Sequence, residues 1–268
     1  AANTPVFGVG TWSQISGPSA AVFSSVVLPD PIVSNLIAGD YVFEWSISNG
    51  TVCPIEKDLV NVKVFTAPTK PDAGPDQNVC ASATTVQLAA NKILIGSGKW
   101  TQVSGPIGTF SDDTSNTSLF TINGPGSYTL EWTASNLNCS ATDKVIINVD
   151  SEPTIADAGL PISNCKFAKL ILNANNADVG SGFWTQISGP TPVVFVVPTS
   201  PKTEVLGVEV GVYVFEWTIS NGVCPPSSSQ VQVTITAEAT IADAGTTQTI
   251  CNTTSATMAA NNPVEGDG

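Results

Sequence analysis

Residues 39–50 read GDYVFEWSISNG, and the phrase returns as GSYTLEWTASN from Gly126 and as GVYVFEWTISNG from Gly211. In the second copy, Tyr128 and Trp132 face one side of an extended chain, while Glu131 faces the other. Alternation with a period of two is typical of a β-strand that has one face on a core and one in water. Three copies of one strand predict three copies of one domain.

Other phrases recur at the same interval. The phrase W-x-Q-x-S-G-P begins at Trp12, Trp100 and Trp184, with separations of 88 and 84 residues, so the period is about 86 residues. Each period holds six or seven short β-type runs separated by Gly, Pro, Asn and Asp, and no sustained helical periodicity. The sequence therefore predicts an all-β chain of tandem immunoglobulin-like β-sandwiches in an elongated array.

Each period carries two Trp and one Tyr at fixed places, and we expect these side chains in the cores. The Gly-x-Tyr entry to the repeated strand resembles a tyrosine corner, and we expect one Trp in each sheet with its polar tip hydrogen-bonded. Stacking of these rings on sugars is the alternative. The expected core aromatics are Trp12, Tyr41, Trp45, Trp100, Tyr128, Trp132, Trp184, Tyr213 and Trp217.

Composition excludes several classes of function. The 268 residues include nine basic side chains, all of them Lys, against 22 acidic ones, which gives a net charge of −13 and no His or Arg. Without His there is no Ser-His-Asp or Cys-His nucleophile. We therefore expect a protein that is not an enzyme. The net negative charge opposes binding to nucleic acid. The sequence contains no run of 18 apolar residues, so we expect no membrane insertion.

The repeat phrases place the domain boundaries. The opening AANTPVFGVGTW and the closing MAANNPVEGDG both match LAANKILIGSGKW at residues 88–100. We expect residues 1–66 to form a repeat that lacks its first two strands, and residues 67–150 and 151–238 to form complete repeats. Residues 239–268 are then the first two strands of a further repeat, either the next one in an array or one that completes a neighbouring chain.

The six cysteines follow the repeat. Cys80 and Cys139 are 59 residues apart, as are Cys165 and Cys224, so we predict one disulfide within each complete repeat. Closing a loop of about 60 residues stabilises by roughly 4 kcal/mol in the chain-entropy treatment. Cys53 and Cys251 are left over, either to pair with cysteines of flanking repeats or with one another between chains. Disulfides predict an oxidising compartment.

Acidic residues recur at the junctions between repeats. The set that calcium would use is Asp72, Asp76, Asp157 and Asp243. Calcium needs six to eight oxygen ligands, and carboxylates at a junction between domains supply some of them. The alternative is that each Asp precedes a turn and caps local backbone N–H groups. No other cofactor is expected.

The phrases PDAGPDQNVC, SGP after the first Trp, and YxFEWxISNG together resemble the PKD-like and Ig-like repeats of very large surface proteins in Bacteroidota. The adhesins of flavobacterial gliding, exported by the type IX secretion system, belong to that group. The resemblance implies a secreted protein of the cell surface with an adhesive or stalk role. In better-known PKD modules an Asp-rich, calcium-associated turn precedes the first Trp strand, whereas residues 96–98 here are Gly-Ser-Gly.

These observations predict a structural and adhesive segment of an extracellular fibre or giant bacterial surface adhesin. The expected partners are neighbouring repeats, copies of the chain arranged head to tail, and surface glycans. One alternative is a filament subunit that assembles by strand complementation. A second alternative is a set of carbohydrate-binding modules attached to a secreted polysaccharide-degrading enzyme.

Overall fold

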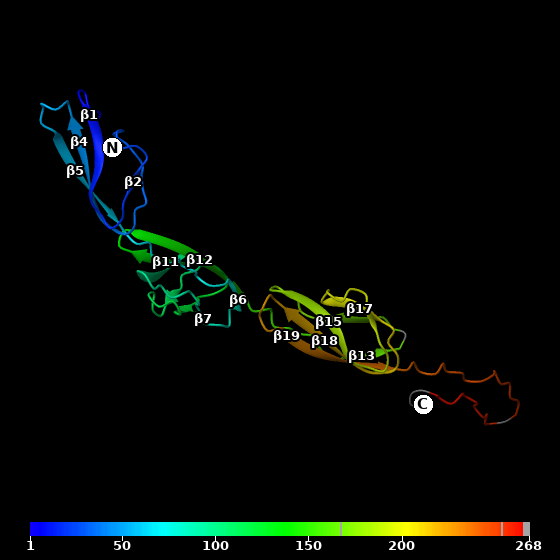
Figure 1. The fold of residues 1–268 in the computed structure, drawn as a ribbon. Helices are drawn as coiled ribbons and strands as arrows, with labels where there is room; N and C mark the ends of the chain where they lie inside the picture. Colours follow the sequence, from blue (N-terminus) through cyan, green and yellow to red (C-terminus); the bar gives the residue numbers. More distant parts are fainter. Residues whose placement is uncertain (167, 253, 265–268) are drawn as a thin grey trace. The chain divides into compact units, whose positions relative to one another are not determined.

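The computed structural model describes residues 1–166, 168–252 and 254–264 (Figure 1). These residues form strands β1 to β19, and the described part of the chain holds no helix. The strands build several β-sandwich domains, which confirms the predicted all-β fold. The chain divides into two compact units, one of Ala1–Gln77, Thr85–Ile122 and Ser127–Ile147, the other of Asn78–Thr84, Asn123–Gly126 and Asn148–Gly268.

The third sandwich consists of two sheets. One sheet has the order β13-β19-β18-β15 and the other β14-β17-β16. The first strand runs parallel to the last, with Ile162 beside Val233 and Cys165 beside Thr236, whereas β19, β18 and β15 are antiparallel. The strands are β13 (Ile162–Cys165), β14 (Leu170–Asn173), β15 (Ser181–Ser188), β16 (Val194–Phe195), β17 (Lys202–Leu206), β18 (Gly211–Ser220) and β19 (Ser227–Thr236).

The second sandwich repeats this plan. Its sheets have the orders β6-β12-β11-β8 and β7-β10-β9. The strands are β6 (Gln77–Cys80), β7 (Thr85–Gln87), β8 (Ser97–Ser104), β9 (Thr109–Phe110), β10 (Leu119–Thr121), β11 (Gly126–Asn136) and β12 (Cys139–Asp150).

The first sandwich has fewer strands. Its sheets have the orders β1-β4-β5 and β2-β3, so β5 lies at a sheet edge. The strands are β1 (Val9–Ser16), β2 (Val22–Phe23), β3 (Val33–Ser34), β4 (Gly39–Ser48) and β5 (Glu56–Val64). By strand order and register, β5 corresponds to β12 and β19, each of which has a further strand on its outer side.

The repeated phrase GxYxxEW forms β4, β11 and β18, and its alternating side chains fill the cores. In β18 the residues Tyr213, Phe215, Trp217 and Ile219 are all fully buried. The two Trp of each repeat lie in one sheet, directly opposite each other on adjacent strands, rather than one in each sheet. The opposed pairs are Trp12 with Trp45, Trp100 with Trp132, and Trp184 with Trp217.

A glycine explains why this Trp pairing fits. Trp217 packs against Gly182, where an added Cβ would lie 2.0 Å from the indole ring. Trp184 donates its indole N–H to the Pro201 carbonyl at 3.3 Å. The indole nitrogens of Trp45, Trp132 and Trp217 are buried without a hydrogen-bond partner, so the expectation that all polar tips are bonded is wrong for these three. Each of these three indole rings instead packs against a glycine of the neighbouring strand, Gly10, Gly98 or Gly182.

The tyrosine corner is present. The Tyr213 hydroxyl accepts a hydrogen bond from the backbone N–H of Glu209, four residues earlier, at 2.8 Å. Tyr41 does the same with Ile37 at 2.8 Å. These bonds fix the entry of the chain into β18 and β4 and keep a buried hydroxyl satisfied.

The Gln of the W-x-Q-x-S-G-P phrase holds the turn that follows it. Gln186 donates to the Thr191 carbonyl at 2.8 Å and accepts from the Val193 N–H at 3.0 Å. Gln102 makes the same two bonds, donating to Pro106 and accepting from Gly108. A single amide that pairs with two backbone groups needs both its donor and its acceptor, which accounts for Gln at this place in each repeat.

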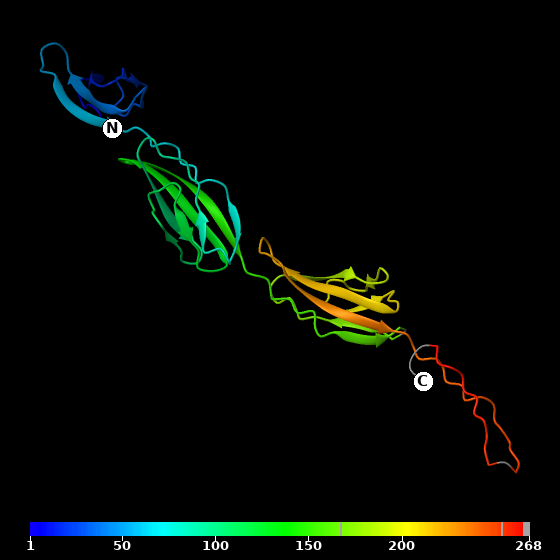
Figure 2. The ribbon, with the colours of Figure 1, turned by 90° about the horizontal axis from the view of Figure 1, so that it is seen from below.

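Residues 239–252 and 254–264 carry no strand, although two strands are predicted there (Figure 2). They keep one local feature of the complete repeats. Asp243 donates its backbone N–H to Asn261 Oδ1 at 2.7 Å, as Asp157 does to Asn175 at 2.9 Å. In the third sandwich the corresponding strands β13 and β14 pair with β19 and β17.

Candidate functional site

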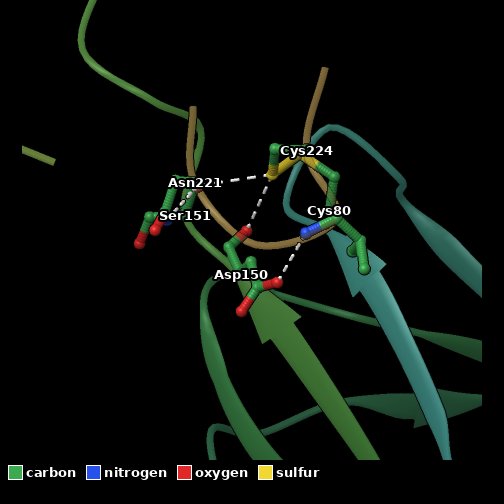
Figure 3. The surroundings of a disulfide bond; sticks show 6 residues. Cys80, Asp150, Ser151, Asn221 and Cys224 are labelled. Atoms are coloured by element: carbon green, nitrogen blue, oxygen red, sulfur yellow. Dashed lines mark hydrogen bonds between the residues drawn. A yellow bond between two sulfur atoms is a disulfide. The ribbon is translucent and has the colours of Figure 1, made fainter. Parts of the chain in front are cut away.

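A disulfide joins Cys80, at the end of β6, to Cys224, in the loop between β18 and β19 (Figure 3). The Cα atoms are 4.7 Å apart and 144 residues separate the two cysteines in sequence. Cys139 and Cys165 are free, so the predicted pairs within one repeat are not made. The bridge instead ties the end of the second sandwich to a loop of the third.

The direction of β6, the first strand of the second sandwich, explains why Cys80 does not pair with Cys139. Figure 3 shows the strands that end at Cys80 and at Asp150 pointing the same way. A side-chain hydrogen bond agrees with this parallel direction: Asp76, just before β6, accepts from the Ile146 N–H of β12 at 2.7 Å. Cys80 therefore lies at the far end of β12, while Cys139 begins that strand roughly 36 Å away. A disulfide needs Cα atoms within about 7 Å.

The loop around Cys224 is fitted closely to the end of β12. Asn221 donates its amide Nδ2 to the Ser151 carbonyl at 2.8 Å, and the Val223 N–H donates to Asp150 Oδ2 at 3.0 Å. Gly222 has a φ of 51°, and a Cβ there would lie 1.8 Å from the same carboxylate oxygen. Two hydrogen bonds and the close approach of Gly222 to Asp150 thus hold the loop of Cys224, which is buried, against the end of β12.

The second sandwich has a corresponding loop. Asn136 donates its Nδ2 to the Thr66 carbonyl at 2.9 Å, as Asn221 does to Ser151. Leu137 has a φ of 54°, so it takes the left-handed conformation that Gly222 has in the third repeat. Left-handed backbone is uncommon for a residue other than Gly. Cys139 therefore follows a bonded Asn by three residues, as Cys224 does, but it is the first residue of β12 and is only partly buried.

Sequence reasoning missed the role of this Asn. The signal was present, since Ser-Asn follows the repeated strand in all three copies, at Asn49, Asn136 and Asn221. An exposed polar residue that recurs at a turn can bond locally or across to another segment. Only the structure identifies its acceptor as a carbonyl just past the preceding last strand.

The remaining cysteines lie on the surface. Cys53 sits in the loop between β4 and β5, and Cys251 lies in the C-terminal residues; both are free and exposed. Cys165 is also exposed, at the end of β13, and Cys139 is partly buried. Their thiols are available for pairing.

The junction aspartates cap turns. Asp72 Oδ1 accepts the Gly74 N–H at 2.9 Å, Asp157 does the same with Gly159 at 2.9 Å, and Asp243 with Gly245 at 2.8 Å. Among the residues that the structure describes, no three His, Cys, Asp or Glu side chains group as metal ligands. The geometry therefore supports the turn-capping interpretation of the Asp-Ala-Gly phrase.

The aromatic side chains considered for sugar stacking are mostly inaccessible. Five of the six Trp side chains are at most 4% exposed, and Tyr41, Tyr128 and Tyr213 are at 0%. Trp12 is half-buried and, with Phe23, Phe43, Val60 and others, lines a groove of about 200 Å³ on the first sandwich.

The groove lies at a position that is buried in the core of the third sandwich. Val60 is 42% exposed, whereas Val231, its equivalent by register with the repeated strand, is 2% exposed. In the third sandwich Leu170 and Leu172 of β14 belong to the core that buries Val231. The first sandwich thus presents an apolar surface that a complete repeat covers with its own strands.

The part of the chain that the structure describes contains no helix able to span a bilayer.

The sequence matches no known family model. The fold is similar to extracellular domains 3–5 of Drosophila OTK, at 14% identity over 87% of this chain and 88% of that one, with a TM-score of 0.47. It is also similar to a three-domain fragment of the titin I-band, at 14% identity over 84% and 87% of the two chains, with a TM-score of 0.42. A PKD domain solved in solution matches 31% of this chain and 86% of its own length, at 27% identity and a TM-score of 0.28.

Proposed function

We propose that this chain is a non-catalytic structural and adhesive segment of an extracellular protein, in which tandem disulfide-stapled β-sandwiches act as a stalk. The observation that carries the proposal is the bridge from Cys80 to Cys224, which fastens one repeat to a loop of the next. A disulfide that crosses between repeats stabilises their junction. A stalk depends on stable junctions between its repeats and does not require a ligand-binding cleft.

Two further features support the proposal. Disulfides persist in oxidising compartments, so the bridge favours a location outside the cytoplasm, here the bacterial cell surface. The aromatic side chains that recur in every repeat are core residues, which leaves them to hold the sandwiches together. The residues that recur in every repeat therefore stabilise the sandwich or connect it to the next repeat.

Localisation and adhesion together test this function. Antibodies raised against the chain should label intact, unpermeabilised cells, and beads coated with the oxidised chain should be retained on a surface that the cells colonise. Beads coated with the heat-denatured chain are the matched control. Labelling that requires permeabilised cells, with Cys80 and Cys224 recovered as thiols, would contradict an extracellular stalk.

Glycans are the adhesive ligand that we would test first. A glycan array probed with the whole chain distinguishes a carbohydrate-binding role from a purely structural one. Because five of the six Trp rings are buried, we expect any sugar contact to involve Trp12 or exposed polar side chains. Binding that survives Trp12→Ala would place the ligand away from the groove.

A further inference from the structure

The loop that carries Cys224 contains a chemically labile pair of residues. The dipeptide Asn-Gly occurs three times in the chain, beginning at Asn49, Asn123 and Asn221. In such a pair the backbone nitrogen of the glycine can attack the side-chain amide carbon of the asparagine, because no side chain on the glycine hinders its approach. Asn49 and Asn123 are exposed, whereas Asn221 is partly buried beside the bridge.

The contacts of this loop restrain the third pair (Figure 3). Asn221 donates its Nδ2, the nitrogen that would leave, to the Ser151 carbonyl at 2.8 Å. The Val223 N–H, on the other side of the glycine, is held by Asp150 Oδ2 at 3.0 Å. The amide and the backbone after it are thus both fixed, so the glycine nitrogen reaches the amide carbon only when the loop opens.

The carboxylate of Asp150 opposes the same reaction by its charge. The attacking group is the backbone nitrogen of Gly222 after it has lost its proton and become negative. A Cβ on Gly222 would lie 1.8 Å from Asp150 Oδ2, so the carboxylate lies directly against this residue. Because a nearby like charge disfavours the charged form of a group, the closed junction slows the loss of that proton.

The second sandwich has the same hydrogen bond without the labile pair. Asn136 donates its Nδ2 to the Thr66 carbonyl at 2.9 Å, but the residue that follows it is Leu137. The branched side chain of a leucine hinders the approach of its backbone nitrogen to the preceding amide. Asn136 is therefore a matched position, equally bonded, that this chemistry leaves unchanged.

We propose that Asn221 is a deamidation site that the bridge from Cys80 to Cys224 protects, and that its modification prevents an opened bridge from forming again. The bridge opens when two small thiols, such as reduced glutathione, supply two electrons and two protons and leave as one disulfide. Loss of the covalent link increases local opening of the loop, and the Asn-Gly pair then reacts. This inference concerns the junction alone and does not depend on an adhesive role.

The modification proceeds in two steps without an external oxidant or reductant. In the first, a bond forms between the Gly222 nitrogen and Cγ of Asn221, while the bond from Cγ to Nδ2 breaks. Nδ2 leaves as ammonia, together with the proton that the Gly222 nitrogen gives up. In the second, water opens the cyclic imide at one of its two carbonyl carbons. Attack at one carbon gives aspartate, and attack at the other gives isoaspartate.

Either product disturbs the contacts that hold the loop. Aspartate at position 221 places a carboxylate oxygen, in place of an N–H donor, opposite the Ser151 carbonyl. It also adds a second negative charge to the site where Asp150 holds the Val223 N–H. Isoaspartate carries the backbone through the side chain, which lengthens the chain by one carbon. In both cases Cys224 is no longer held beside Cys80.

The first test compares the bridged chain with the chain reduced by a phosphine without denaturant, both kept at mildly alkaline pH. Digestion with trypsin and an enzyme that cleaves after Glu places Asn123, Asn136 and Asn221 in separate peptides, and mass spectrometry locates the deamidation. In the reduced chain, Asn221 should react at a rate approaching that of Asn123. In the bridged chain Asn221 should react roughly tenfold more slowly, since the loop must first open. Asn123 should react equally in both forms, and Asn136 in neither.

Matched variants test the consequence for the bridge. In a glutathione redox buffer, Asn221→Asp should lower the equilibrium constant for forming the bridge roughly tenfold, as expected for the loss of one hydrogen bond. Asn136→Asp makes the same change in the second sandwich and should leave the bridge as it is in the unaltered chain. Equal rates of deamidation at Asn221 in the bridged and reduced chains would overturn the proposal, and this measurement needs no variant. So would an Asn221→Asp chain that forms the bridge as readily as the unaltered one.

Discussion

The carboxylate of Asp150 occupies the space that a side chain at position 222 would need. Its Oδ2 accepts the Val223 N–H at 3.0 Å and would lie 1.8 Å from a Cβ on Gly222. Any side chain at position 222 would therefore require the Asp150 carboxylate to move away from the loop. This close approach lies next to Cys224, which is bridged to Cys80.

Gly222→Ala should therefore destabilise the loop and slow formation of the disulfide. The left-handed φ alone costs about 1 kcal/mol for Ala, and the contact with Asp150 adds to this cost. Thermal unfolding and the rate of oxidative refolding measure the effect. Gly50→Ala is the control, because Gly50 has a φ of 74° with nothing within 4 Å of the added Cβ. Equal losses for the two variants would mean that the contact with Asp150 is unimportant.

Removal of the bridge should lower stability substantially. For Cys80→Ser with Cys224→Ser, the chain-entropy treatment of a loop of about 145 residues gives a loss of roughly 5 kcal/mol. Guanidinium unfolding of the oxidised chain and of the double variant measures the difference. Cys139→Ser should leave the unfolding midpoint of the monomer unchanged, and a comparable loss in that variant would restore the pairing within one repeat.

Gly182→Ala should disrupt the third sandwich. The added methyl would lie 2.0 Å from the Trp217 ring, and overpacking of this kind costs about 1–3 kcal/mol. Tryptophan fluorescence during denaturation reports the change directly. Ser181→Ala, at the exposed neighbouring position, is the matched control. An unchanged midpoint for Gly182→Ala would show that the Trp pair can shift without penalty.

Tyr213→Phe should cost about 1–2 kcal/mol, because it leaves the Glu209 N–H and the Thr191 hydroxyl without their 2.8 Å partner. Chemical denaturation gives the value. Tyr41→Phe should cost a similar amount in the first sandwich, where the Ile37 N–H loses its acceptor. If the two losses differ widely, the corner contributes through its surroundings rather than through the hydrogen bond.

The β-strands and the all-β fold could be predicted from the sequence because both are local and are written three times. The pairing of the cysteines could not. Equal separations of 59 residues arise from any two positions that recur in every repeat, so they do not distinguish a bridge within a repeat from a bridge between repeats. The deciding fact is that β13 runs parallel to β19, and no local pattern in residues 162–165 encodes that direction.

The Trp pairs illustrate the same limit. Burial of Trp184 and Trp217 follows from alternation, but their shared sheet follows from the register between β15 and β18, in which Gly182 gives room to the indole. The sequence shows that the Asn before the last strand recurs in every repeat. Its acceptor could not be predicted, because Ser151 and Asn221 are 70 residues apart in sequence.

The bridge also changes how tension would pass along the polypeptide. Force applied from the N-terminal side reaches β6, crosses the sulfur–sulfur bond at Cys80 and continues from Cys224 into β19. Residues 81–223 lie outside this covalent path. A pull that would otherwise unravel almost two whole sandwiches can therefore extend very little of either one while the bond remains intact.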